Sequence, residues 1–145
     1  MIISCNTTNL NKALQTVQRA IISKPSTPIF SGIHLLTRDG KLEIQAMDIN
    51  MAISCNIEAD IIKAGEIVVS AKHFSELVRK LPEENLTITK NTENHTIKVT
   101  SGKSEYQLLL MNEEDYPKFP VFDAEKSIAI EDTMIKELIK KTIFS

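Results

Sequence analysis

The chain repeats one order of hydrophobic and polar patterns. A short stretch of alternating apolar and polar residues is followed by polar capping residues, and then by apolar residues three and four positions apart. Alternation is typical of a half-buried strand, and spacings of three and four place apolar side chains on one face of a helix. The copies, each with its first apolar helix residue, are residues 2–21 (Leu10), 67–81 (Phe74) and 128–144 (Met134). Their nearly constant spacing predicts a duplicated structural unit, with a third copy cut off at Ser145.

Three further alternating stretches follow each of the first two helices. These predicted strands are residues 33–37, 42–47 and 49–57 in the first copy, and residues 86–88, 97–99 and 106–110 in the second. In the stretch 49–57 one buried face is expected to hold Ile49, Met51, Ile53, Cys55 and Ile57. The pattern therefore predicts an α+β fold in which a β-α-β-β-β unit occurs twice and two helices pack on antiparallel sheets.

The pattern also predicts domain boundaries. Residues 1–111 form the first domain, and residues 112–126 read as an interdomain linker because they lose periodicity, gather acidic residues and hold two prolines. Residues 127–145 begin a second domain. No strands follow this third helix to cover its apolar stripe, so we expect the segment to be disordered or packed against a neighbouring molecule.

Composition narrows the class of protein. The 145 residues are 42% hydrophobic and 25% charged, with a formal net charge of −2, which excludes a bulk polycation that adheres to any nucleic acid. No apolar run has membrane-spanning length, so a cytoplasmic protein with no membrane partner is the simplest interpretation. Cys5 and Cys55 form no CxxC pair and are expected to be packed, reduced thiols.

The sequence offers little for catalysis. It contains no phosphate-binding glycine loop, zinc-protease motif or nucleophile elbow, and its histidines, His34, His73 and His95, are scattered. Asp48 and Asn50 at a strand junction are better explained as turn residues than as a carboxylate site. We therefore predict no catalytic residue, no metal site and no cofactor.

Basic residues are more informative, because each predicted helix carries them opposite its apolar stripe. They are Lys12 and Arg19, then Lys72, Arg79 and Lys80, then Lys136, Lys140 and Lys141. For one helix alone, a solvated surface is the better explanation. Three equivalent helices in an acidic chain instead favour a common basic lining that holds a phosphate backbone without reading sequence. Lys24, in a loop stiffened by prolines, is a further candidate phosphate contact.

Five motifs carry a resemblance to a known family. They are residues 24–33 (KPSTPIFSGI), 46–51 (AMDINM), 69–74 (VSAKHF) with 79–82 (RKLP), 101–103 (SGK) and 115–117 (DYP). In order and spacing they resemble the first domain of the bacterial DNA polymerase III beta sliding clamps. The resemblance covers the whole chain, with the second domain opening at about Ser127.

The resemblance implies a DNA-clamp fold and a homodimeric ring of similar domains that encircles duplex DNA. Such a ring is a processivity factor rather than an enzyme, and its partners are DNA polymerase III and the clamp loader. By position, Lys24 and Lys72 match basic residues near the DNA. The matching subunit interface would involve His73, Leu77 and Leu81 on the second helix, with Lys103, Tyr106 and Leu108 on the last strand.

A second interpretation comes from a different class. The same domain could be a protein-interaction adaptor that does not bind DNA, with its lysine-rich helix faces merely solvated. Under the clamp interpretation, the 145-residue chain alone is expected to bind DNA negligibly at physiological salt, because the residues that close the ring would lie beyond Ser145.

Overall fold

The computed structural model describes residues 1–22, 25, 27–120 and 129–143. The strands are β1 (Ile2–Asn6), β2 (Gly32–Arg38), β3 (Lys41–Met47), β4 (Ala52–Lys63), β5 (Glu66–Ser70), β6 (Asn85–Asn91), β7 (Thr96–Ser101) and β8 (Ser104–Met111). The helices are α1 (Thr7–Val17), α2 (Ala71–Arg79) and α3 (Asp132–Thr142), with short 3-10 turns η1 (Gln18–Ala20), η2 (Pro28–Ser31) and η3 (Glu113–Asp115). Apart from these short turns, the order β-α-β-β-β occurs twice before α3.

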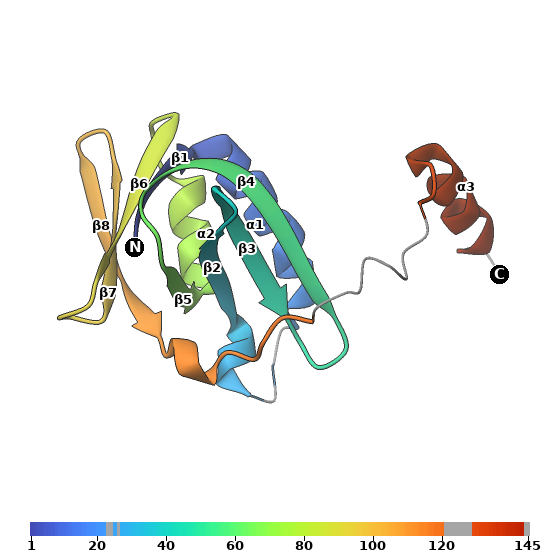
Figure 1. Ribbon diagram of the computed structural model, residues 1–145, viewed down its shortest axis with the longest axis horizontal. Coiled ribbons are helices and arrows are strands. Elements are labelled where there is room, and N and C mark those ends of the chain that lie inside the picture. Colours follow the sequence, from blue (N-terminus) through green and yellow to red (C-terminus); the bar gives the residue numbers. More distant parts are fainter. Residues whose placement is uncertain (23–24, 26, 121–128, 144–145) are drawn as a thin grey trace.

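The eight strands close into one antiparallel barrel, in the order β1-β4-β3-β2-β5-β8-β7-β6. The strands curve around α1 and α2, which contact each other (Figure 1). The predicted α+β class is therefore confirmed, but the separate antiparallel sheets expected from the sequence are joined into one closed surface. Closure removes most strand edges, which otherwise attract other chains.

Local sequence accounts for the start of each helix. The Asn6 side chain accepts a hydrogen bond from the Asn9 amide at 3.0 Å and so caps α1. Ser70 takes the same position before α2, but its side chain makes no capping hydrogen bond. Between β2 and β3, Asp39 and Gly40 have positive φ angles of 51° and 74°, as the predicted tight turn requires.

The predicted bounds of β4 are wrong at both ends. Ile49 and Met51 are 72% and 52% exposed and precede the strand, which runs on to Lys63. The Asp48 amide donates to the Met51 carbonyl at 2.7 Å, so residues 48–51 form a turn that interrupts the alternation. Beyond Ile57 the strand continues because residues 59–63 pair with β1. Ile53, Cys55 and Ile57 do pack against the core as predicted.

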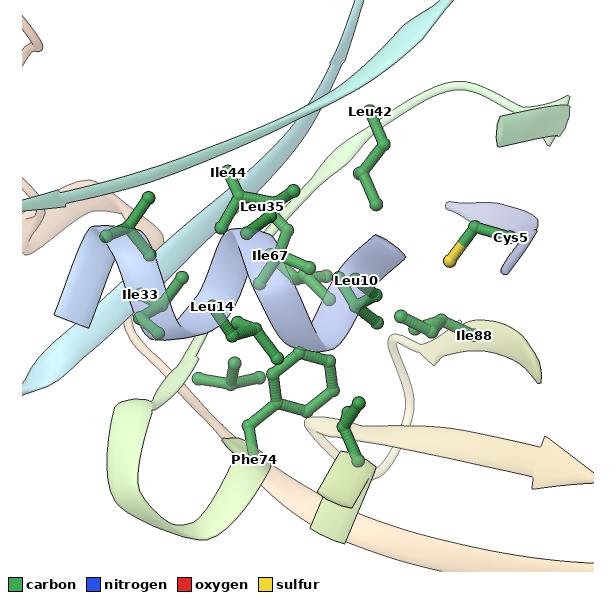
Figure 2. Packing of buried hydrophobic residues seen from close by; sticks show 14 of the residues in the cluster. Cys5, Leu10, Leu14, Ile33, Leu35, Leu42, Ile44, Ile67, Phe74 and Ile88 are labelled. Atoms are coloured by element: carbon green, nitrogen blue, oxygen red, sulfur yellow. The ribbon is translucent and has the colours of Figure 1, made fainter. Parts of the chain in front are cut away.

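One large hydrophobic core lies between the barrel and the two helices. Figure 2 shows Phe74 of α2 pointing toward α1, with Leu10 and Leu14 near its ring. A second, smaller cluster lies on the other face of the sheet, because adjacent residues of a strand point to opposite faces. It consists of Ile29, Met47, Val68 and Tyr116, with Phe30, Ala52, Met111 and Phe119 packed against it.

The first part of the predicted linker is folded onto the barrel. Glu113 to Asp115 form η3, and the Tyr116 side chain that follows is only 7% exposed. Lys90 of β6 holds this turn, since its Nζ lies 2.5 Å from Glu113 Oε1. Residues 121–126 lie outside the described part of the chain, so the domain boundaries stay a prediction.

The third copy is only partly as expected. Ile128 lies outside the described residues, and residues 129–131 form no strand. The helix α3 does form, so disorder does not apply to residues 132–142, and packing against a neighbouring molecule, the other expected outcome, stays a prediction. Its apolar side chains are exposed and are not covered by the barrel, as the missing strands led us to expect. Within the described residues, no helix is both long and apolar enough to cross a membrane.

The two cysteines should differ in reactivity. Burial raises the pKa of the Cys5 thiol to about 12, and partial burial raises the pKa of the Cys55 thiol. Because the thiolate is the reactive form, we expect a disulfide reagent at about pH 8 to modify Cys55 slowly and Cys5 only after unfolding. Absorbance of the released thiol, with and without urea, measures both. Equally rapid reaction of two thiols in the native chain would contradict the packing described above.

Candidate functional site

Charge is distributed unevenly over the barrel. The exposed charged side chains of α1, η1, α2 and its C-cap are Lys12, Arg19, Lys72, Arg79, Lys80 and the single acid Glu76. These elements are thus strongly basic in a chain whose formal net charge is −2. The remaining surface is correspondingly acidic, and a polyanion would be attracted to the helix side of the molecule.

The basic residues of the two helices do not occupy equivalent turns. Lys12 lies six residues after the N-cap residue Asn6, whereas Lys72 lies two residues after the N-cap residue Ser70. Each of the two copies nevertheless has a pair of cations seven residues apart, Lys12 of α1 with Arg19 of η1, and Lys72 with Arg79 of α2. In a regular helix this spacing corresponds to about 10 Å, so each pair can contact phosphates at two points along a backbone.

A groove of about 600 Å³ runs between α1 and α2. Its polar lining includes Gln15 and Gln18 from the first copy, and Lys72, Ser75, Glu76 and Arg79 from the second. Ile21 and Ile22 are apolar residues of the same lining. The Gln18 side-chain amide donates to the Ala71 carbonyl at 3.1 Å and to the Ser75 hydroxyl, which ties the end of α1 to the first turn of α2. The two helices on either side of the groove are therefore held together by these hydrogen bonds as well as by the hydrophobic core.

The structure brings together only some of the predicted phosphate contacts. Lys72 and Arg79 line the groove, while Lys12 and Arg19 are exposed on α1 and η1 and are not part of its lining. Lys24 lies outside the described residues. Lys136 and Lys140 are exposed on α3, where Lys136 Nζ pairs with Asp132 Oδ2 at 2.6 Å, and neither lines the groove.

A second surface lies where the barrel closes least completely. β8 pairs with β7 from Ser104 to Leu109, but it pairs with β5 only at Leu110 and Met111. The Leu110 amide donates to the His95 carbonyl at 2.9 Å, so this amide points toward β7. Because backbone groups alternate in direction along a strand, the amides of Glu105, Gln107 and Leu109 point away from β7.

The predicted interface residues border this edge or pack into the core behind it. Tyr106 is 39% exposed, Lys103 is exposed in the β7–β8 turn, and Leu108 packs against the core. On α2, His73 is exposed and Leu77 is half-buried against the same core. Leu81 is half-buried there too, but the prediction that it lies on the second helix is wrong, because α2 ends at Arg79. The sequence analysis missed Leu109, which is 76% exposed. The sequence did contain a signal for it, because Leu109 is an apolar residue at a position where an alternating strand is expected to have a polar one.

The histidines of the described part of the chain lie in different parts of the fold. Across residues 1–22, 25, 27–120 and 129–143, no cluster of His, Cys, Asp and Glu is arranged to hold a metal ion. His34 Nε2 lies 2.9 Å from Glu66 Oε2, and its ring lies beside Tyr116 with centroids 5.2 Å apart. His73 and His95 are exposed on α2 and in the β6–β7 turn. These histidines therefore do not form one site.

Comparison with known proteins points to one family. The family model described as DNA polymerase III beta subunit, N-terminal domain, matches residues 1–120. The chain is 31% identical over 144 residues to the beta sliding clamp of Bacillus subtilis, covering 94% of this chain and 38% of that protein. It is 30% identical to a Vibrio harveyi beta sliding clamp sequence, covering 94% of each.

The fold gives the same result. The crystal structure of the Bacillus subtilis DNA polymerase sliding clamp superimposes with a TM-score of 0.93 at 27% identity, over 100% of this chain and 40% of that one. The chain thus spans about two fifths of the length of most of these relatives, and the resemblance noted in its motifs is confirmed.

Proposed function

Because the chain belongs to the DNA polymerase III beta subunit family, the beta sliding clamps, we propose that it serves as the first part of a DNA-encircling processivity factor. The full-length protein would form a homodimeric ring in the cytoplasm, slide on duplex DNA and hold DNA polymerase III after a clamp loader closes it, without catalysing a reaction. The observation that carries this proposal is the family match over residues 1–120, on a barrel whose basic charge is concentrated on α1 and α2.

The strand pairing supports an internal duplication. The first strand of each unit pairs with the second strand of the other, β1 with β6 and β5 with β2. In both pairings the residue that precedes the helix lies opposite the first residue of the partner strand, Asn6 opposite Asn85 and Ser70 opposite Gly32. Two units related by a pseudo-twofold axis would produce this pattern, and repetition of such units would build a ring.

The helix side is the natural candidate for the DNA-facing surface. Lys72 and Arg79 in the groove, with Lys12 and Arg19 exposed on α1 and η1, offer positive charges to phosphates. Contacts of this kind position a protein on DNA without reading bases, which suits a protein that must move along any sequence. Lys24, Lys136 and Lys140 would extend the same lining in the assembled ring.

The open edge of β8 is the natural candidate for subunit contact. The outward amides of Glu105, Gln107 and Leu109 can donate hydrogen bonds to a strand of a second subunit. Main-chain pairing of this kind extends a sheet across an interface. Tyr106, Leu108 and Lys103, with His73 and Leu77 of α2 and Leu81 just after it, would surround that contact. Exposed Leu109 would become buried on assembly.

The proposal is tested by comparing the full-length protein on nicked circular DNA and on the same DNA after linearisation. A ring placed around the circle should be retained during gel filtration and lost from the linear form. The outcome that would favour the adaptor alternative is equal, weak binding to both forms, because ordinary electrostatic binding does not depend on free ends.

The double variant Lys72→Ala/Arg79→Ala of the full-length ring tests whether the helix side contacts DNA. Each phosphate contact contributes about 0.9 to the slope of log affinity against log salt, and a homodimeric ring carries each residue twice, so the double variant should lower the slope by about 2 to 4. Lys41→Ala is the matched control, since Lys41 is exposed and pairs with Glu58 on the β3–β4 side of the barrel. An equal change in both proteins would place the DNA elsewhere.

A further inference from the structure

Glu76 is an acidic residue in the middle of the basic surface. It lines the α1–α2 groove with Lys72 and Arg79 and is the only acidic residue of α1, η1 and α2. Lys72 lies four residues before it, Arg79 three residues after it and Lys80 four residues after it. Residues three and four apart are neighbours on a helix surface, so one carboxylate is within reach of three cations.

The position of Glu76 can be compared with the same position in the other two helices. Counted from the N-cap, the sixth residue is Lys12 in α1, Glu76 in α2 and Glu137 in α3. In α3, Glu137 Oε2 lies 3.8 Å from Lys141 Nζ, four residues later. Glu76 and Lys80 have the same spacing and the same order, acid before base, which is the favourable order on a helix. The first copy has a cation where the other two have an acid.

We propose that Glu76 is a positioning residue that keeps the α2 cations exchangeable on DNA. When a phosphate moves away from Lys72, Arg79 or Lys80, the carboxylate offers each cation an alternative partner on its own helix. The carboxylate also repels the phosphates themselves. Both effects weaken each individual phosphate contact and lower the barrier between successive contacts, so the ring moves rather than stalls. This inference rests on the proposed function.

The test measures by fluorescence how the full-length ring moves along stretched DNA. Glu76→Gln should slow one-dimensional diffusion about threefold at low salt, the size expected from removing one screened charge interaction, and the difference should fade as salt rises. Glu76→Lys introduces a lysine, the residue that the first copy has at this position (Lys12), and should slow diffusion further. Glu93→Gln is the control, because it removes the same charge from an exposed turn between β6 and β7.

The outcomes separate the two ideas. If Glu76→Gln and Glu76→Lys both diffuse as fast as the unaltered ring and the Glu93→Gln ring, the inference about Glu76 is wrong while the clamp function stands. If the unaltered ring is not retained on circular DNA at all, the proposed function fails first. Melting curves of the variants show whether the exposed substitutions leave the barrel folded.

Discussion

Replacing Gln107 with proline in the full-length protein is expected to break the dimeric ring while leaving the barrel folded. The Gln107 amide points away from β7, so its loss removes no hydrogen bond from the β7–β8 ladder. At the open edge, however, proline provides no amide and its ring obstructs an incoming strand. We expect the dimer dissociation constant to rise at least about a hundredfold, which corresponds to roughly 3 kcal/mol. Sedimentation or mass photometry measures it.

Two further variants show whether the effect comes from the edge. Gln107→Thr keeps the amide and a β-forming side chain, so the ring should persist. Leu108→Pro removes an amide that faces β7 and should destabilise the barrel itself, because a proline inside a ladder breaks it. A Gln107→Pro protein that dimerises normally would assign the subunit contact to another surface, and it would remove the main structural support for a role of β8 in the ring.

Most of the fold was predictable because its signals are local. The stripe of α1 and the alternation of β7 depend on residues close in sequence, and both patterns survive in the structure. The strands β2 and β3 were also recognised from their apolar residues, although both bury residues of both faces and so do not alternate between buried and exposed positions. The bounds of β4 were not predictable in this way. Its end depends on pairing with β1, about 60 residues away. Its start depends on the Asp48 to Met51 turn, which breaks an otherwise continuous alternation.

Tyr116 shows a second limit. Acidic residues and prolines around it are typical of a linker, yet its ring is buried beside His34 on the outer face of the sheet. Only tertiary packing determines whether such a segment is extended or folded back. The open edge of β8 is the same kind of feature, because it exists only where β5 is too short to pair with residues 104–109.

The candidate site was predicted in part. Counting cations on each helix indicated the basic side of the molecule, and the structure places Lys72 and Arg79 in one groove there. The count did not reveal that the cations occupy different turns of α1 and α2, or that Glu76 lies among them. Both features depend on where each helix begins, with Asn6 at the N-cap of α1 and Ser70 at the N-cap of α2.

Phe74→Ala is expected to give the largest loss of stability. Phe74 is fully buried in the first turn of α2, in the same core cluster as Leu10 and Leu14 of α1 (Figure 2). Truncating a buried phenylalanine removes its transfer free energy and leaves a cavity, at a cost of about 3 to 5 kcal/mol. Domains of this size are stable by about 5 to 15 kcal/mol, so the variant should lose a large part of its stability.

Urea unfolding of the 145-residue chain measures the loss and also shows whether the two copies fold together. Because Phe74 belongs to the second copy and its core neighbours Leu10 and Leu14 to the first, the variant should shift one cooperative transition of the whole barrel rather than create two. Leu109→Ala is the control and should change the free energy of unfolding by less than about 0.5 kcal/mol, since Leu109 is exposed. A loss below about 1 kcal/mol for Phe74→Ala, or separate transitions for the copies, would contradict a single shared core.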